Sequence, residues 1–221
     1  MAVAAQLADF LVGLAVPRLC WSCSALTRRG EPLCGGCRAG LRRLGAEPIL
    51  VSGVAVWAPV AYSGPARDLV RALKFRGAVR LADTMAAQIV ANAPSGLVEG
   101  RTVVPVPLHP RRLRSRGYNQ AAAIAEALGR RADLAVRDCL FRSGPSVTQI
   151  GRNRAERRTG PVGTIAVRAS PEAPAPGVPA RVILVDDVVT TGATLEACRD
   201  ALVAHGARDV VAICFARTIG R

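Results

Sequence analysis

Lysine is almost missing from this sequence, because Lys74 is the only lysine among 30 Lys and Arg residues. The 221-residue chain has 16 Asp and Glu residues, so its formal net charge is +14, and nearly all the positive charge is arginine. This balance favours phosphate-bearing partners, either nucleic acid or a phosphorylated small molecule. A GC-rich genome would produce the same composition, with arginines that merely solvate the surface. Composition leaves both interpretations open, and the positions of the arginines must decide.

Long apolar runs and aromatic residues are also scarce. No uncharged apolar run reaches about 18 residues, which argues against a membrane span. The N-terminal stretch has no Lys or Arg ahead of its apolar residues, so we expect an amphipathic helix ended by Pro17 and no signal peptide. We therefore expect a cytoplasmic protein with reduced thiols. Aromatic residues make up 4% of the chain, which leaves few rings to stack on nucleic-acid bases.

Four cysteines near the N-terminus have the spacing of a structural zinc knuckle. Two C-x2-C pairs, "CWSC" and "CGGC", are separated by ten residues. Four thiolates complete a tetrahedral shell, so the predicted Zn²⁺ would hold structure and would not catalyse. The predicted ligands are Cys20, Cys23, Cys34 and Cys37. The alternative is four unrelated buried thiols. The other cysteines, Cys139, Cys198 and Cys214, lie alone in apolar surroundings and are expected in the core.

Strand and helix patterns alternate along the rest of the chain. Strands are expected over 54–62, 102–110, 162–167, 181–186 and 209–216, and helices over 66–77, 80–94, 119–132 and 194–207. Because the strands are continuous apolar runs, this order predicts an α/β fold, a parallel sheet with helices on both faces. We expect an N-terminal helix and cysteine segment over 1–50 and the α/β domain over 51–221. Ligands bind at the carboxyl ends of such strands, here after Leu108 and after Val185.

The most informative motif, "VILVDDVVTTGAT", occupies residues 182–194. Backbone N–H groups of its turn and of the following helix would converge on one phosphate, which Gly192 lets approach closely. Threonine hydroxyls add further donors. The predicted phosphate seat consists of Val188, Val189, Thr190, Thr191, Gly192, Ala193 and Thr194.

Two adjacent acids, Asp186 and Asp187, precede this seat. Their carboxylates would accept hydrogen bonds from the vicinal hydroxyls of a sugar and help to hold hydrated Mg²⁺. A capped turn between a strand and a helix would explain the threonines but not the paired acids. The motif therefore predicts a ribose-5-phosphate site.

An arginine-rich loop is expected at the other strand end, in "VPVPLHPRRLRSRGYNQ" (104–120). Guanidinium groups beside the carboxyl edge of a sheet suit pyrophosphate, which they contact in a bidentate manner. The predicted residues are Arg111, Arg112, Arg114 and Arg116. A solvated basic loop is the alternative, and the position between strand and helix favours the anion site.

These motifs resemble known families. The stretch 182–194 is similar to the phosphoribosyl-pyrophosphate (PRPP) signature of type I phosphoribosyltransferases: four apolar residues, two acids, two apolar residues and T-T-G-A-T. The cysteine pairs, "LVRALKFRG", the arginine motif and "TQIGRNRAER" together resemble the ComF competence family, also described as GntX-like. This resemblance implies a type I phosphoribosyltransferase fold, an N-terminal zinc segment and a role in DNA uptake during natural transformation.

The resemblance also implies roles for residues. The two acids would be the catalytic pair on the ribose and metal side, the arginines and Lys74 would lie near pyrophosphate, and residues 142–158 would form a lid. Relatives tend to read R-x-x-N-(V/L)-x-G-A-F where this chain has "RRTGPVGTI". Gly160 and Ile165 thus replace the Asn and the aromatic residue, which leaves open how the lid region folds.

Two functions remain open at this point. An enzyme would bind PRPP with Mg²⁺ and release pyrophosphate to an acceptor that the sequence does not identify. No general base stands out, since His109 and His205 are the only histidines. A catalytically silent protein would instead sense PRPP and bind single-stranded DNA alongside DNA-uptake proteins.

Overall fold

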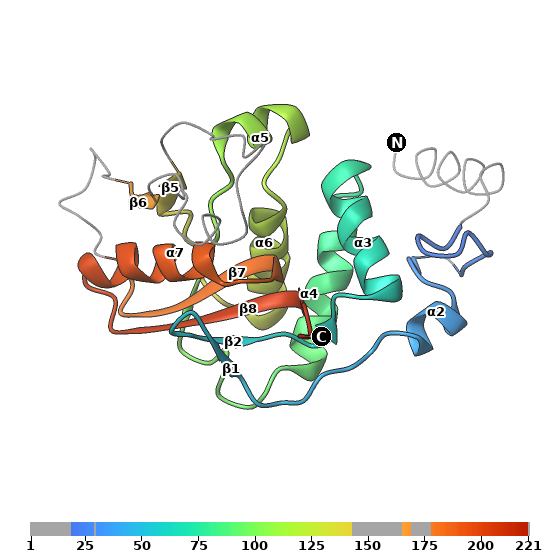
Figure 1. Cartoon of the computed structure of the whole chain (residues 1–221), viewed down its shortest axis with the longest axis horizontal. Coiled ribbons are helices and arrows are strands. Elements are labelled where there is room, and N and C mark those ends of the chain that lie inside the picture. The colour runs from blue at the N-terminus through green and yellow to red at the C-terminus, as the bar shows by residue number, and fades with distance from the viewer. Residues whose placement is uncertain (1–18, 29, 143–164, 169–177, 221) are drawn as a thin grey trace, which may run out of the picture.

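The computed structural model describes residues 19–28, 30–142, 165–168 and 178–220 (Figure 1). A six-stranded sheet lies at its centre in the order β1-β2-β8-β7-β4, and the short β3 also pairs with β8. The strands are β1 (Ile49–Val51), β2 (Val54–Trp57), β3 (Val60–Ala61), β4 (Thr102–Pro105), β7 (Arg181–Val189) and β8 (Asp209–Arg217). Strand β1 is antiparallel to β2, whereas the other pairs in this sheet are parallel.

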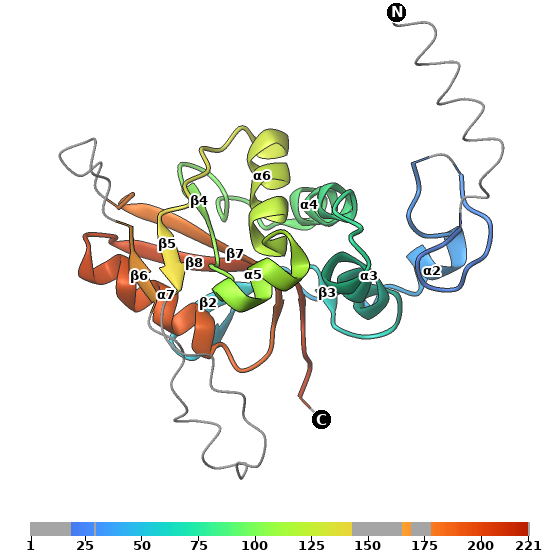
Figure 2. The ribbon, with the colours of Figure 1, turned by 90° about the horizontal axis from the view of Figure 1, so that it is seen from above.

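Helices cover both faces of the sheet, as expected. They are α2 (Gly35–Ala39), α3 (Gly64–Phe75), α4 (Leu81–Asn92), α5 (Pro110–Arg116), α6 (Gln120–Ala132) and α7 (Ala193–Ala204). Helices α3, α4 and α6 lie on one side of the sheet and α7 on the other (Figure 2). In β7, Ile183 and Val185 pack into the core on the side of α3, α4 and α6. Val182 and Leu184 pack into the core on the side of α7. A strand that is apolar on both faces is what a doubly covered parallel sheet requires, and the expected α/β fold is confirmed.

The ends of the central strands differ from the expectation. Strand β4 stops at Pro105 and not near residue 110, whereas β7 runs beyond Asp186 to Val189. Strand β8 causes the extension of β7, because it stays paired with β7 as far as Val189 and Arg217. A pairing partner supplied by a distant segment thus overrides the local polarity of the two acids.

The expected arginine loop is instead the short helix α5. Pro110 occupies its first turn, where a missing N–H costs nothing, and the His109 ring accepts a hydrogen bond from the Arg111 N–H at 3.2 Å. Gly117 ends the helix in the left-handed region, at φ +83°. The arginines therefore project from a helix at the carboxyl edge of the sheet.

A second, antiparallel ladder joins β5 (Leu140–Arg142) to β6 (Ile165–Val167). Residues 165–167 of the strand expected over 162–167 do form a strand, but it pairs with β5 in this separate ladder and not with the central sheet. The expected N-terminal helix, the motif at 148–157 and most of the expected lid lie outside the described residues. Within the described part of the chain, no helix combines the length and apolarity needed to cross a membrane.

Candidate functional site

A cavity of about 250 Å³ opens at the carboxyl edge of the sheet. The last residues of β7 and residues that follow β3, β4 and β7 form its floor, and residues from four helices and the end of β5 form its walls. The lining residues are Tyr62, Lys74, Val106, Pro107, Leu108, Arg112, Gln120, Arg142, Asp186, Asp187, Val188, Thr190 and Thr194. Ligands of open parallel sheets bind at this edge, so both sequence motifs converge where a ligand site is expected.

The two acids lie where β7 extends past its neighbour β4. The last β4 pair joins Pro105 to Val185, and the Val106 N–H then donates to the Val185 carbonyl at 2.9 Å. Beyond this point the chain after β4 turns away toward α5, while β7 remains paired with β8. The step between the two strand ends makes room for the cavity beside the acids.

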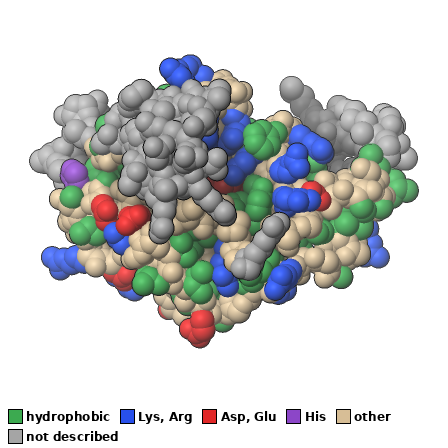
Figure 3. All heavy atoms as spheres, in the orientation of Figure 1, with side chains coloured by type: hydrophobic (Ala, Val, Ile, Leu, Met, Phe, Trp, Pro, Cys, Tyr) green, Lys and Arg blue, Asp and Glu red, His purple; other side chains and the backbone are tan. Residues whose placement is uncertain are grey.

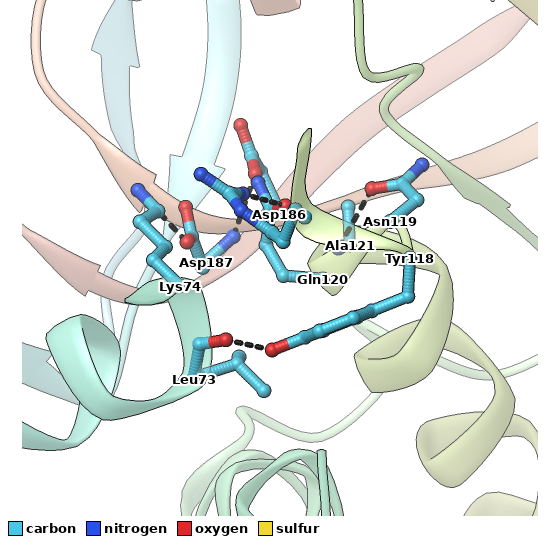
Figure 4. Close-up of polar contacts among 9 residues, drawn as sticks. Leu73, Lys74, Tyr118, Asn119, Gln120, Ala121, Asp186 and Asp187 are labelled. Carbon is cyan, nitrogen blue, oxygen red and sulfur yellow. Dashed lines mark hydrogen bonds and ion pairs between the residues drawn. The ribbon is translucent and has the colours of Figure 1, made fainter. Parts of the chain in front are cut away.

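The carboxylate of Asp187 is buried, with 2% of its side chain exposed, and Lys74 neutralises it. The Lys74 Nζ lies 2.8 Å from Asp187 Oδ2, although the contact lacks hydrogen-bond alignment (Figure 4). Lys74 comes from the last turn of α3, so the one lysine of the chain crosses from a helix to the carboxyl edge of the sheet. An uncompensated charge at this depth would be costly, which explains the need for an ammonium here.

Asp186 is half-buried, and its Oδ1 accepts a hydrogen bond from the Asp187 N–H at 2.8 Å. Burial and the neighbouring charge of Asp187 raise the pKa of Asp186 well above its usual range. A cation or hydroxyl donors at this carboxylate would favour its charged form. Lys74 balances the charge of the neighbouring Asp187. These residues fit a hydrated Mg²⁺ or the hydroxyls of a sugar.

The opposite wall carries positive charge. Arg112 from α5 and Arg142 from the end of β5 both line the cavity. Burial and the nearby charge of Arg112 lower the pKa of Arg142. The Arg142 Nε is buried and has no hydrogen-bond partner among the described residues. A bound anion would offset the repulsion between these two partly desolvated guanidinium groups.

The turn after β7 adds Thr190 and Thr194 to the cavity. Helix α7 begins at Ala193, and no side chain caps its N-terminus, so the end of the helix favours negative charge. Gly192 precedes it at φ +81°, and a Cβ at Gly192 would lie 2.6 Å from Val51 Cγ1. The end of β1 and the residue that follows it therefore leave no room for a side chain at position 192.

Hydrogen bonds connect the segments that form the walls of the cavity (Figure 4). The Tyr118 hydroxyl donates to the Leu73 carbonyl, which connects the start of α6 to the last turn of α3. Asn119 caps α6 through a 3.0 Å hydrogen bond from the Ala121 N–H, and its amide donates to the Val106 carbonyl. These hydrogen bonds join α3, residues 118–119 and the segment after β4, which itself bonds to β7 through Val106. The position of Lys74 relative to the two acids therefore depends on contacts between these four segments.

The four predicted zinc ligands come together at the far end of the molecule. The sulfur atoms of Cys20, Cys23, Cys34 and Cys37 all lie within 4.8 Å of one another. The Cys23 and Cys34 sulfurs are 3.6 Å apart, close to the roughly 3.8 Å that a tetrahedral Zn–S shell implies. The Cys37 N–H points at the Cys34 sulfur at 3.5 Å. The cluster could bind a zinc ion.

The thiols of this cluster also titrate as a group. Burial opposes ionisation of Cys20, but backbone hydrogen bonds from Cys23, Cys34 and Ser22 outweigh it and lower its pKa to about 6. The thiol of Cys37, hydrogen-bonded to Cys23 and partly desolvated, has its pKa raised to about 12. Thiolates this close cannot all ionise without a cation, which a divalent metal would supply.

Comparison with known proteins places the chain among relatives of two kinds. No protein-family model matches it. It is 28% identical over 234 residues to the DNA utilization protein YhgH of Salmonella typhimurium, covering 93% of this chain and 100% of that protein. It is 31% identical over 141 residues to Competence protein F of Haemophilus influenzae, covering 61% of this chain and 60% of that protein. The chain is a homologue of these proteins. The resemblance to the competence family is thereby confirmed.

Among solved structures, the chain is similar to the glutamine PRPP amidotransferase of B. subtilis, with a TM-score of 0.37 and 20% identity. The match covers 60% of this chain, which spans about a quarter of the length of that structure.

The cavity gathers some of the residues expected at the site and leaves others outside. Lys74, Arg112, Asp186, Asp187, Val188, Thr190 and Thr194 line it, whereas Arg111, Arg114, Arg116, Val189, Thr191, Gly192 and Ala193 do not. Arg116 instead donates to the Gln120 side chain and lies over the Phe75 ring.

Sequence reasoning did not single out Tyr62, Gln120 or the residues 106–108, and it named Arg142 only as the start of the lid. The signal for Tyr62 was available, because it follows a strand whose carboxyl end meets the same edge. Arg142 and Gln120 reach the cavity through tertiary contacts that no local pattern indicates.

Proposed function

We propose that the cavity binds PRPP with Mg²⁺ and that the protein releases pyrophosphate during glycosyl transfer. The observation that carries this proposal is the juxtaposition, in one cavity, of paired acids, threonine hydroxyls and two arginine side chains from separate elements. The homologues and the signature at 182–194 support it further. Each part of PRPP, a phosphate, a vicinal diol and a pyrophosphate, finds a chemically matched group.

The 5′-phosphate would lie at Thr190, Thr194 and the uncapped start of α7, where hydroxyl and backbone donors and the helix dipole favour an anion. Asp186 would accept hydrogen bonds from the ribose hydroxyls. Mg²⁺, when bound with PRPP, would neutralise the pyrophosphate and stabilise the charged form of Asp186.

Arg112 and Arg142 would contact the pyrophosphate and stabilise the charge that develops as it leaves. Lys74 would keep Asp187 charged and oriented at the floor. Such groups act by position and by charge, so the proposal requires no general base.

The homologues connect this activity to DNA. One relative is named for DNA utilization and another for competence, and we infer that this chain acts in the handling or uptake of DNA. A second candidate function is a catalytically silent PRPP sensor that binds single-stranded DNA. Arg111 and Arg114 of α5 favour this candidate, because they are exposed and offer phosphate contacts outside the cavity.

Titration calorimetry with PRPP and Mg²⁺ tests the proposal. The wild-type protein should bind, and Asp186→Asn should weaken binding at least about tenfold, because charge-assisted hydrogen bonds are worth roughly 1.5–3 kcal/mol. Asp200→Asn, which alters an exposed acid of α7, is the matched control and should bind like wild type. No binding heat for folded wild-type protein would refute the proposal.

A pyrophosphate-release assay separates the two candidates. Release from PRPP that depends on Mg²⁺ and is lost in Asp186→Asn supports the enzyme. PRPP binding without release, together with single-stranded DNA affinity that falls steeply with salt, supports the sensor.

A further inference from the structure

Phe75 is the last residue of α3 and follows directly after the cavity-lining Lys74. Its relative exposure is 73%. The Arg116 guanidinium carbon lies 5.6 Å from the centre of its ring. One face of the ring is thus engaged in a cation–π contact, and most of the remaining ring surface faces solvent.

The arrangement of this pair is held from both sides. Arg116 donates a hydrogen bond to the side chain of Gln120, a buried residue that lines the cavity. The Tyr118 hydroxyl donates to the Leu73 carbonyl, two residues before Phe75. A scattered exposed apolar side chain needs no explanation, but here Gln120 holds the Arg116 side chain and Tyr118 holds the end of the helix that carries the ring.

The surroundings favour an anionic, planar ligand. Lys and Arg side chains lie on both sides of an apolar patch in the region of α3 and α5 (Figure 3). Leu113 of α5 is also partly exposed, at 43%. A ring with a free face beside basic side chains is the combination that stacks bases while contacting phosphates.

We propose that Phe75 and Arg116 form a stacking subsite for a nucleobase, either a free base or a base within a single strand. This inference rests on the proposed function, because it places the base beside the site proposed for the phosphoribosyl group. The base would stack on the open face of Phe75, and N–H groups of Arg116 other than the one that donates to Gln120 would donate to its acceptor atoms. The ligand that binds beside the phosphoribosyl group would therefore be a planar heteroaromatic ring and not an aliphatic amine.

Two probes distinguish the sources of the base. Equilibrium dialysis with adenine measures a free base, and fluorescence anisotropy with a labelled 12-residue oligothymidylate measures a single strand. Phe75→Ala should weaken binding of at least one probe about ten- to a hundredfold, and Phe75→Trp should retain it. Arg116→Lys, which keeps the charge but not the planar group, should weaken it less.

Matched controls exclude general effects. Leu50→Ala removes an apolar side chain of similar exposure, 76%, on the distant strand β1, and Arg130→Lys changes an exposed arginine of α6. Both should bind the probes like wild type. PRPP affinity should stay within about twofold of wild type in Phe75→Ala, since stacking adds no phosphate contact.

The outcomes separate this inference from the proposed function. Loss of adenine binding in Phe75→Ala identifies a free-base subsite, and loss of oligonucleotide binding identifies a single-strand subsite. Unchanged affinity for both probes in Phe75→Ala, or no binding of either probe to wild type, overturns the inference. Failure of PRPP to bind while the Phe75 effect persists refutes the proposed function alone.

Discussion

At the residue scale, several positions carry more than one constraint. Lys74 balances a buried carboxylate, lines the cavity and is held by the contact of the preceding residue with Tyr118. Gly192 combines a left-handed backbone with a position too close to Val51 for any side chain. Substitution of such a residue should lower the free energy of unfolding more than usual, because it violates two structural requirements at once.

Replacement of Gly192 by alanine should destabilise the protein more than a comparable change elsewhere. Gly206 also has a positive φ, +103°, but a Cβ there would meet no atom within 4 Å. Gly206→Ala should therefore cost only the backbone strain, about 1–2 kcal/mol, and Gly192→Ala about 1–3 kcal/mol more from the clash. Urea unfolding of both variants measures the difference, and equal costs would contradict the clash.

At the scale of elements, an ion cluster ties the amino ends of three parallel strands. Arg101, just before β4, contacts Asp209 at the start of β8 at 2.7 Å, and Arg181 at the start of β7 lies 3.6 Å from the same carboxylate. Arg101 is nearly buried, with two nitrogen atoms that lack hydrogen-bond partners among the described residues. Asp209 compensates the charge of this guanidinium.

Asp209→Asn should lower the free energy of unfolding at pH 7 by about 1–2 kcal/mol, a value reduced from that of a buried pair because the carboxylate is partly exposed. The hydrogen bond from Arg101 lowers the pKa of Asp209, opposed by partial burial. Stability from this pair is therefore complete above the unfolded pKa of about 3.9 and disappears as the pH falls through the lower folded pKa.

Urea unfolding between pH 7 and pH 2.5 tests this expectation. The difference between wild type and Asp209→Asn should shrink toward zero at the acidic end. Asp83→Asn, which breaks the exposed pair with Arg131, is the control and should cost less than about 1 kcal/mol. A difference that stays constant with pH would show that the carboxylate charge is not responsible.

At the scale of the whole molecule, the cysteine module (residues 19–28 and 30–40) is continuous with the main core. Cys20 and Leu33 belong to the same cluster of buried residues as Leu69 of α3. The Ser22 hydroxyl also donates to Asp68 of α3 at 2.7 Å. Helix α3 therefore connects the module to the rim of the cavity, and the division of the chain at residue 50 stays a prediction.

We expect the cysteine cluster to bind zinc, and removal of this metal should loosen α3 before α7. Structural zinc supplies folding free energy to small modules, so Cys34→Ser should lose bound metal, lower the melting temperature and raise amide exchange in α3. Helix α7, on the other face of the sheet (Figure 1), should keep its protection. Hydrogen exchange with mass spectrometry measures this, with Cys139→Ser as the control that retains zinc. Equal exchange in α3 with and without metal would contradict the coupling.

Local patterns were enough to predict most of the elements and to name candidate ligand-binding residues. The helices at 66–77, 119–132 and 194–207 and the strand at 209–216 match the structure within a few residues, because periodicity and capping act over one or two turns. The cysteine cluster was predictable for the same reason, since C-x2-C spacing is a local geometry. The acids and threonines of 182–194 could be named as candidates because one strand and one turn hold them.

What the tertiary structure alone decided is which residues meet. The reach of β7 depended on β8, the arginines divided between the cavity and the Phe75 ring, and Lys74 found Asp187 across the gap between a helix and the sheet. The free energy of such contacts comes from desolvation and pairing between segments far apart in the chain. The sequence by itself determined which chemical groups this protein carries, and the packing of helices on the sheet decided which of those groups meet.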